Sequence, residues 1–392
     1  MVTQPTVADA LAASDALRGR VARTPVLRAE ALDRLVGGPA AAKAECLQHT
    51  GSFKLRGMLN RVRTLSSEAL NAGLITVSAG NAALGAAYAA REFGARLTVV
   101  MPSSAVPEKL RAVRGFGATV VCDGITNATA AFATAEALQA EHGYTFLHPF
   151  DDPMVIAGAA TATIEFLEDE PELARMLVPC SGGSLIAGAT LGARAMGSSV
   201  EIIGVQPERS DGIVRSLAVG VPTPPPAIAT IADGLTAPKP GQINLELIRS
   251  ARLRVVTVSD EMILAALGEI VRALRVVVEP AAAVGLAALL SQPSLAGPGR
   301  TGLMLTGSNV SMALLAQVLS ELPGRLPRTR VLVYPTTAHA VVGRMTGTLT
   351  ARRGTSGKRL AEGNVWGDGR CVAARREGPR DPRASRPGTQ AR

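Results

Sequence analysis

Between residues 73 and 207 the chain alternates short apolar runs with alanine-rich stretches that are long enough for helices. The runs are GLITVS (73–78), LTVVMP (97–102), TVVCDG (119–124), YTFLHP (144–149), RMLVPC (175–180) and VEIIGVQP (200–207). Helices are predicted between them over 81–93, 107–116, 128–141, 154–168 and 184–196. This alternation is typical of a parallel, doubly wound α/β fold, in which ligands bind beyond the carboxyl ends of the strands.

The composition agrees with such a fold. Of the 392 residues, 47% are hydrophobic but only 3% are aromatic, so the core must consist mainly of Ala, Val, Leu and Ile. This length suits two lobes. No apolar run is long enough to span a membrane without interruption, and the first residues lack the pattern of a signal peptide. We therefore expect a cytoplasmic protein with no membrane partner.

The net charge of +9 is concentrated near the carboxyl end, where residues 331–392 hold twelve Lys or Arg and four Asp or Glu. The rest of the chain is almost neutral, so the charge does not favour a nucleic-acid partner.

The four cysteines (Cys46, Cys122, Cys180 and Cys371) are far apart and form no CxxC pair. This spacing favours free thiols over a zinc site or a disulfide framework.

Three loops directly follow apolar strands: SAGN (78–81), CSGGS (180–184) and TGSN (306–309). In CSGGSLIAG (180–188) the glycines and the start of the next helix can present backbone N–H groups to a phosphate. A glycine-rich turn between a strand and a helix is the equally weighted alternative. The chain has neither a GK[ST] ending nor a GxGxxG fingerprint here, which disfavours a nucleotide or dinucleotide.

Lys54 lies in the stretch GSFKLRG (51–57), beside an aromatic residue and between two glycines. Most lysines are solvated surface charges. A lysine that forms an imine must instead lose its proton, which requires removal from water or a nearby cation to lower its pKa from about 10.4. The local sequence alone leaves both interpretations open.

Nine stretches together resemble the fold-type II pyridoxal-phosphate enzymes, specifically the threonine and serine dehydratases that include the serine racemases. In chain order they are RTPVLRAEAL (23–32), QHTGSFKLRGMLN (48–60), SAGNAALGAAYAA (78–90), VVMPSSAVPEKL (99–110), HPFDDPMVIAG (148–158), VPCSGGSLIAG (178–188), TIADGLTAPKPG (230–241), VVVEPAAAVGLAAL (276–289) and LTGSNV (305–310). The resemblance covers about residues 15–322. It implies two-lobed architecture with parallel twisted sheets flanked by helices.

The resemblance implies pyridoxal 5'-phosphate as cofactor and a role for each matching residue. Lys54 looks like the lysine that binds the cofactor covalently and acts as catalytic base, with Phe53 against the ring. Asn81 would meet the cofactor's 3-hydroxyl, and Thr306 the pyridine nitrogen. The residues that resemble the phosphate loop are Ser181, Gly182, Gly183, Ser184 and Leu185. Those that resemble the substrate-carboxylate loop are Ser78, Ala79, Gly80 and Asn81. Glu279 matches a motif near the ring, or is simply an acid favoured at a helix N-terminus.

The implied reaction is β-elimination from L-threonine or L-serine, which gives a 2-oxo acid and ammonia and belongs to amino-acid metabolism such as isoleucine biosynthesis. Three positions depart from the family pattern: Ala82 replaces a histidine, SGGS replaces a run of glycines, and Ala79 replaces the second serine of racemases. Ala79 predicts poor racemisation. The alternatives are a racemase, a β-replacing synthase, or a cofactor-binding protein with impaired catalysis.

Relatives with a divalent-metal site use carboxylates in the segment matching GVQPERSDG (204–212), where Gln206 and Gly212 replace two of them. We therefore expect no metal of that kind, although Glu208 and Asp211 lie nearby.

The predicted domains are a large one (1–52 and 145–323), a small one (53–144) and a basic tail (324–392). We interpret the tail as disordered or as an altered remnant of a regulatory domain; a polyanion-binding extension is the alternative. The family implies a homo-oligomer, a dimer or a tetramer.

Overall fold

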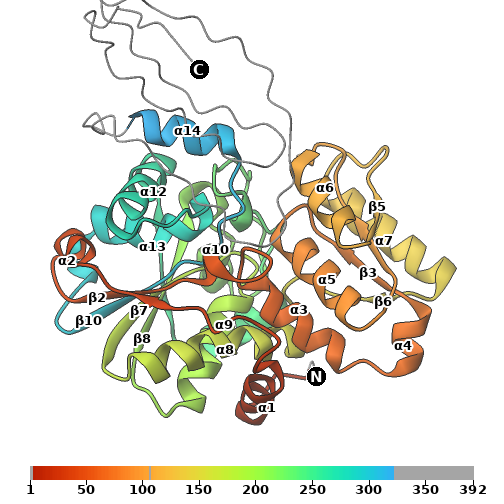
Figure 1. Ribbon diagram of the computed structural model, residues 1–392, viewed down its shortest axis with the longest axis horizontal. Helices are drawn as coiled ribbons and strands as arrows, with labels where there is room; N and C mark the ends of the chain where they lie inside the picture. The colour runs from red at the N-terminus through yellow and green to blue at the C-terminus, as the bar shows by residue number, and fades with distance from the viewer. Residues whose placement is uncertain (1–2, 106, 322–392) are drawn as a thin grey trace, which may run out of the picture. The chain divides into compact units, whose positions relative to one another are not determined.

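The computed structural model describes residues 3–105 and 107–321, which form two sheets covered by helices (Figure 1). The first sheet has six strands in the order β1 (Val26–Leu27), β2 (Ala40–Lys43), β10 (Arg300–Met304), β7 (Leu173–Pro179), β8 (Glu201–Pro207) and β9 (Arg254–Val258). The second has four strands in the order β5 (Thr119–Val121), β4 (Leu97–Val100), β3 (Leu74–Val77) and β6 (Thr145–Phe146). The tail predicted over 324–392 and Cys371 lie outside the described residues.

All neighbouring strands in both sheets are parallel except β1 and β2, which pair antiparallel. The predicted α/β class with parallel sheets is therefore confirmed. The six apolar runs each contain a strand, and the five helices predicted between residues 81 and 196 are present with ends shifted by at most one residue. β1, β2 and β9 were not predicted.

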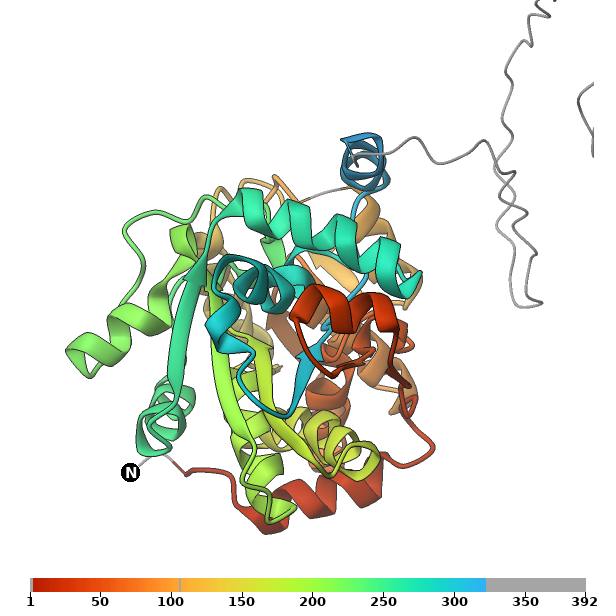
Figure 2. The ribbon, with the colours of Figure 1, turned by 90° about the vertical axis from the view of Figure 1, so that its left-hand side faces the viewer.

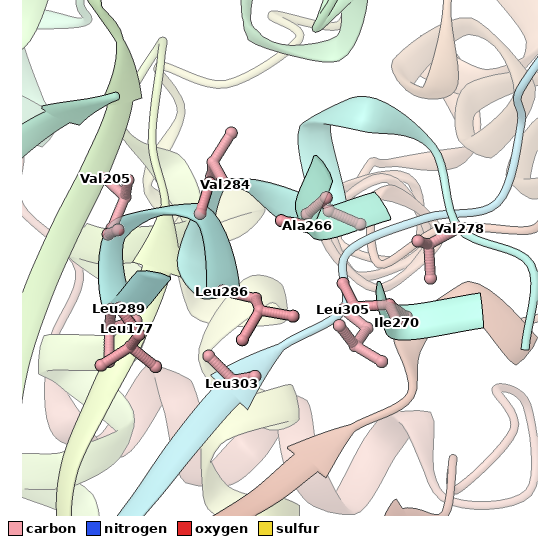
Figure 3. Close-up of a cluster of buried hydrophobic side chains, with 14 of the residues drawn as sticks. Leu177, Val205, Ala266, Ile270, Val278, Val284, Leu286, Leu289, Leu303 and Leu305 are labelled. Carbon is pink, nitrogen blue, oxygen red and sulfur yellow. The ribbon is translucent and has the colours of Figure 1, made fainter. Parts of the chain in front are cut away.

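Helices cover both faces of the six-stranded sheet, as Figure 2 shows from the side. Adjacent residues of a strand point to opposite faces. Leu177 of β7 accordingly packs with α12 and α13, whereas Met176 packs with α8 and α9. Figure 3 shows Leu303 of β10 beside Leu286 of α13 and Leu177 of β7 beside Leu289 of the same helix, and all four belong to one buried cluster. A sheet buried on both faces explains why its strands appear in the sequence as continuous apolar runs.

The helices around this sheet are α1 (Val7–Leu17), α2 (Glu30–Val36), α8 (Pro153–Asp169), α9 (Ser184–Ala195), α10 (Gly212–Val219), α11 (Gln242–Ser250), α12 (Asp260–Leu274), α13 (Pro280–Ser291) and α14 (Met312–Glu321). Those of residues 54–142 are α3 (Lys54–Arg63), α4 (Ser67–Ala72), α5 (Asn81–Glu92), α6 (Pro107–Gly115) and α7 (Ala128–His142). Short 3-10 turns are η1 (Glu45–Leu47), η2 (Glu208–Ser210), η3 (Asp233–Leu235) and η4 (Pro293–Leu295). None of the helices described here is long and apolar enough to cross a membrane. The predicted domain boundaries remain a prediction.

α8 packs closely against both α3 and α9. It begins at Pro153, where the carboxylate of Asp152 accepts hydrogen bonds from the Met154 and Val155 amides. A Cβ on Gly158 of α8 would lie 2.4 Å from the carbonyl oxygen of Arg56 in α3, and one on Gly188 of α9 would lie 2.9 Å from the Ala160 amide nitrogen of α8. Glycine is therefore required at both crossings.

A buried cluster of charges joins α3, β2, η1 and α8. Arg56 has no solvent exposure, and its guanidinium donates to the carboxylates of Glu45 and Glu165 at 2.7–2.8 Å. It also donates to the Thr161 hydroxyl and the Ala22 carbonyl. The fourth charge of the cluster is the ammonium of buried Lys43, 2.7 Å from Glu165. The cluster thus has two cations and two anions, so each buried charge has a partner of opposite sign.

Replacing Arg56 with methionine would leave Glu45 and Glu165 without their main partner. We expect Arg56→Met to destabilise the protein by about 3–5 kcal/mol, the usual cost of leaving one buried charge unpaired. Denaturant unfolding measures this loss. Arg111→Met is the matched control: Arg111 forms an exposed pair with Glu108, so its loss should cost less than about 1 kcal/mol. Similar costs for the two variants would contradict the role of the cluster.

Candidate active site

Lys54 is the first residue of α3, and its ammonium faces a cavity between the two sheets. Its Nζ donates to the carbonyl oxygen of Pro149 at 3.2 Å and lies 5.2 Å from the centre of the Phe53 ring. Removal from bulk water lowers the pKa of Lys54 to about 8, although the charge of Glu279 opposes this shift. The amine is therefore much more often neutral at neutral pH than that of an ordinary surface lysine, as imine chemistry requires.

The loop 180–184 connects β7 to the N-terminus of α9 and has a shape that only glycine permits. Gly183 adopts a left-handed conformation with φ of 104°. A Cβ on Gly182 would lie 2.5 Å from Cγ of Phe150, and one on Gly183 would lie 2.6 Å from Cβ of Asn244. No side chain caps α9, so its first-turn N–H groups are directed toward the loop and the cavity. This is the geometry of an anion site at a helix N-terminus.

Hydrogen bonds from the following segment fix this loop. The carbonyl oxygen of Gly182 accepts from the Gly241 amide and from Nδ2 of Asn244, both at 2.9 Å. The hydroxyl of Ser181 accepts from the Ala237 amide at 2.9 Å. Ser181 thus uses its side chain to hold the neighbouring segment.

Asp151 and Asn244 are two supporting residues that the sequence did not single out. The Asp151 carboxylate accepts from the Gln242 and Ile243 amides at the start of α11, the helix that carries Asn244. Asp151 belongs to the quoted stretch HPFDDP, so a signal for it existed. No feature of QINLEL (242–247) marks Asn244, because its role depends on a contact 62 residues away in the chain.

Asn81 and Glu279 line the cavity and, together with Asn309, form a hydrogen-bonded row. Nδ2 of Asn81 donates to Glu279 and Oδ1 of Asn81 accepts from Nδ2 of Asn309, both at 2.7 Å. Burial raises the pKa of Glu279 to about 7, a shift that the hydrogen bond from Asn81 opposes. Asn309 comes from the TGSN loop, whose position after a strand was noted, but its contact with Asn81 was not predicted.

The loop 78–81 lies between β3 and the N-terminus of α5. The Ser78 hydroxyl accepts a hydrogen bond from the Gly80 amide at 3.1 Å, which tightens the turn. No side chain caps the first turn of α5, so its N–H groups remain available for an anion such as a carboxylate. Ala79 and Ala82 line the cavity without adding a polar group.

The cavity has a volume of about 320 Å³, and every residue predicted for the site lines it. These residues are Phe53, Lys54, Ser78, Ala79, Gly80, Asn81, Ser181, Gly182, Gly183, Ser184, Leu185, Glu279 and Thr306. Thr306 follows β10, the neighbour of β7, so its loop and the glycine loop lie at the same edge of the sheet. The roles assigned to the individual residues remain predictions.

The cavity fits a phosphorylated aldehyde. The glycine loop and the start of α9 supply N–H groups for a phosphate without a basic side chain, and the Lys54 amine lies in the same cavity. Phe53 provides an aromatic surface beside that amine. Lys54 would bind the aldehyde and residues 181–185 the phosphate of pyridoxal phosphate.

In the segment 204–212, Gln206 stands where relatives with a metal site carry a carboxylate, and its side-chain amide is hydrogen-bonded. Oε1 of buried Gln206 accepts from the Ile213 and Val214 amides, and its Nε2 donates to the Ser210 carbonyl, all at 3.1 Å. Asp211 is paired with Arg215 at 2.7 Å. Among residues 3–105 and 107–321 no three His, Cys, Asp or Glu side chains are grouped closely enough to hold a metal ion. Cys46, Cys122 and Cys180 are free thiols.

Comparisons with known proteins agree with this geometry. The family model described as pyridoxal-phosphate dependent enzyme matches residues 17–307. An L-threonine ammonia-lyase of Geobacter sulfurreducens is 40% identical over 309 residues, which are 79% of this chain and 77% of that protein. An L-threo-3-hydroxyaspartate ammonia-lyase of Saccharomyces cerevisiae is 35% identical over 81% of this chain and 97% of the yeast protein. The structure of maize serine racemase superposes with a TM-score of 0.77 at 31% identity, covering 81% of this chain and 98% of that one.

This protein therefore belongs to the pyridoxal-phosphate-dependent enzymes of fold type II, as the sequence motifs predicted. Its cofactor is pyridoxal 5'-phosphate. Within the family it is similar to the group of threonine ammonia-lyases and serine racemases.

The glycine loop can be tested directly. In Gly182→Ala the new methyl group would overlap the Phe150 ring, so the loop must move away from the shape that presents its N–H groups. We expect the dissociation constant of pyridoxal phosphate to rise at least about tenfold, or about 1.4 kcal/mol. Equilibrium titration of the cofactor into apoprotein measures this. Gly115→Ala, where no atom lies within 4 Å of the added Cβ, should bind like the wild type.

Proposed function

We propose that this protein is an ammonia-lyase that removes the β-hydroxyl and amino groups of L-threonine, L-serine or a close β-hydroxy amino acid. The products are a 2-oxo acid and ammonia. The observation that carries the proposal is that one cavity holds three features: the Lys54 amine with its lowered pKa, the glycine loop at the N-terminus of α9, and the N-terminus of α5. The names of the relatives support elimination but differ in substrate, between threonine and 3-hydroxyaspartate.

When bound, pyridoxal phosphate supplies an electron-accepting ring that weakens the bonds at the α carbon of the substrate. The residues of this chain then have three tasks. Lys54 binds the cofactor and, as a free neutral amine, accepts the α proton. The N–H groups at the start of α5 hold and orient the substrate carboxylate. The hydroxyl of Thr306 would meet the ring nitrogen and, unlike a carboxylate, would not keep it protonated.

By meeting the ring nitrogen with a hydroxyl instead of a carboxylate, Thr306 would favour loss of the β-hydroxyl over return of a proton to the α carbon. Ala79 adds to this preference, because a methyl group offers no proton to the opposite face of the substrate. These two residues favour elimination over racemisation. The SAGN and glycine loops keep enough N–H groups that Ala82 and the two serines need not impair catalysis.

We further propose that the enzyme works in the cytoplasm as a homo-oligomer. The oligomeric state is what the resemblance of the sequence motifs implies. A β-replacing synthase is the second candidate; it would need an added nucleophile to consume its substrate, whereas a lyase releases the 2-oxo acid without one.

Activity against β-hydroxy amino acids tests the proposed function. The purified holoenzyme should release 2-oxobutanoate from L-threonine and pyruvate from L-serine without an added nucleophile, as measured with a coupled dehydrogenase. D-serine formed from L-serine, measured by chiral chromatography, should be a minor product. A cofactor-loaded protein that forms no 2-oxo acid from any β-hydroxy amino acid would contradict the proposal.

The role of Lys54 has its own test. After reduction with borohydride, the wild type should carry one covalently attached cofactor, visible in the intact mass. Lys54→Ala should carry none and should lose turnover, because it has no amine at the cavity. The control is Lys239→Ala: Lys239 is exposed and does not line the cavity, so this variant should behave like the wild type.

The lowered pKa of Lys54 predicts a pH dependence of cofactor capture by the apoprotein. Only the neutral amine attacks an aldehyde, so the rate should rise with pH through about 8 and level off above it. An ordinary lysine would still show a rising rate near pH 10. Glu279→Gln removes a negative charge that stabilises the Lys54 cation, so its profile should shift to lower pH. Stopped-flow absorbance between pH 6.5 and 9.5 measures both profiles.

A further inference from the structure

One wall of the cavity is assigned neither to the cofactor nor to the substrate carboxylate. It combines Pro102, Ala128 and Phe132 with the segment 233–238 and Lys109. With the amine of Lys54 and the loop 181–185 holding the cofactor, and the loop 78–81 holding the carboxylate, this wall faces the group attached to the β carbon. Its chemistry therefore determines which amino acids fit.

The charges on this wall are paired with each other. Among residues 3–105 and 107–321, four charged residues line the cavity. Apart from Lys54 and Glu279 they are Lys109 of α6 and Asp233 of η3. The ammonium of Lys109 donates directly to the Asp233 carboxylate; the side chains are 19% and 52% exposed. Lys109 is thus a cation at the cavity whose charge is already matched.

The segment that carries Asp233 is held in place. The hydroxyl of Thr236 donates to the carbonyl oxygen of Asp233 at 2.7 Å, and the Ala237 amide donates to Ser181 of the glycine loop at 2.9 Å. The position of Asp233 opposite Lys109 is therefore set by the same contacts that fix the cofactor loop.

The remaining part of the wall is uncharged, and its side chains are apolar except for Thr236, whose hydroxyl donates within its own segment. Phe132 packs against the rings of Phe146 and His148, with centroids 6.2 and 6.1 Å apart. Burial lowers the pKa of His148 to about 4, so this ring is neutral at pH 7 and offers no cation. A carboxylate placed against this wall would lose its hydration without gaining a partner, which is costly.

We propose that Asp233 sets the substrate class of the enzyme: by engaging Lys109, it leaves the described lining of the cavity without a free cation for a second substrate carboxylate. The pocket therefore selects β-hydroxy amino acids whose β-substituent is uncharged. This inference rests on the proposed function, and it narrows that function to threonine-like rather than hydroxyaspartate-like substrates.

Turnover of the holoenzyme gives the first test. The wild type should have a kcat/KM for L-threonine at least tenfold above that for L-threo-3-hydroxyaspartate. In Asp233→Asn the ammonium of Lys109 is freed to meet a substrate carboxylate, and the ratio should move at least tenfold toward 3-hydroxyaspartate, mainly through a lower KM. The double variant Lys109→Met/Asp233→Asn removes the freed cation and should restore the wild-type ratio.

Asp211→Asn is the matched control. Asp211 also pairs with a basic residue in an adjacent segment, Arg215, but does not line the cavity, so its loss should leave the ratio unchanged. A wild type that prefers 3-hydroxyaspartate, or an Asp233→Asn variant whose ratio stays within twofold of the wild type, would overturn the proposal.

Binding of unreactive amino acids separates this proposal from the proposed function. L-Aspartate and L-2-aminobutyrate carry no β-hydroxyl group, so neither can undergo the elimination. By titration calorimetry on the holoenzyme, the wild type should bind L-2-aminobutyrate more tightly, and Asp233→Asn should bind L-aspartate at least tenfold more tightly than the wild type does. This result would support the inference even if no 2-oxo acid formed. Tighter binding of L-aspartate by the wild type would overturn it even in an active lyase.

Discussion

The neutral cluster of Arg56, Lys43, Glu45 and Glu165 joins the elements around the catalytic lysine. Arg56 stands two residues after Lys54, on the first turn of the same helix, and its guanidinium donates to groups of η1 and α8. A buried arginine needs all of its hydrogen-bonding partners, because an unpaired charge in the interior costs several kcal/mol of folding free energy. The beginning of α3 is therefore held in one position, and this fixes the backbone of Lys54, the first residue of the helix.

Much of the fold could be predicted from the sequence, and strand β2 shows why some elements were missed. Strands such as LITV and LTVV are buried on both faces, so they appear as continuous apolar runs. β2 reads AAAK, where alanine has little preference for strands and a lysine suggests solvent. Lys43 is buried because Glu165, 122 residues further on, neutralises it. Such compensation between distant residues leaves no local pattern.

The site could be predicted as far as its loops. Three glycine- or asparagine-containing turns each follow an apolar strand, and the resemblance to a known family connected them with one cofactor. The residues that support these loops could not be found in this way. Asn244 holds Gly182 from the first turn of a helix whose sequence carries no marker for this role, and Lys109 contacts Asp233 from 124 residues away. Both pairs join segments that are remote in the sequence and that only the folded chain brings into contact.

The glycine contacts of α8 make this helix a spacer of fixed width. On one side it touches the backbone of α3, which begins with the reactive amine; on the other it touches α9, which begins at the glycine loop. One helix, with a glycine at each crossing, thus sets the separation between the amine and the phosphate site. A substitution that widened either crossing would move the amine away from the phosphate site, whereas the opposite wall of the cavity can change without altering that separation.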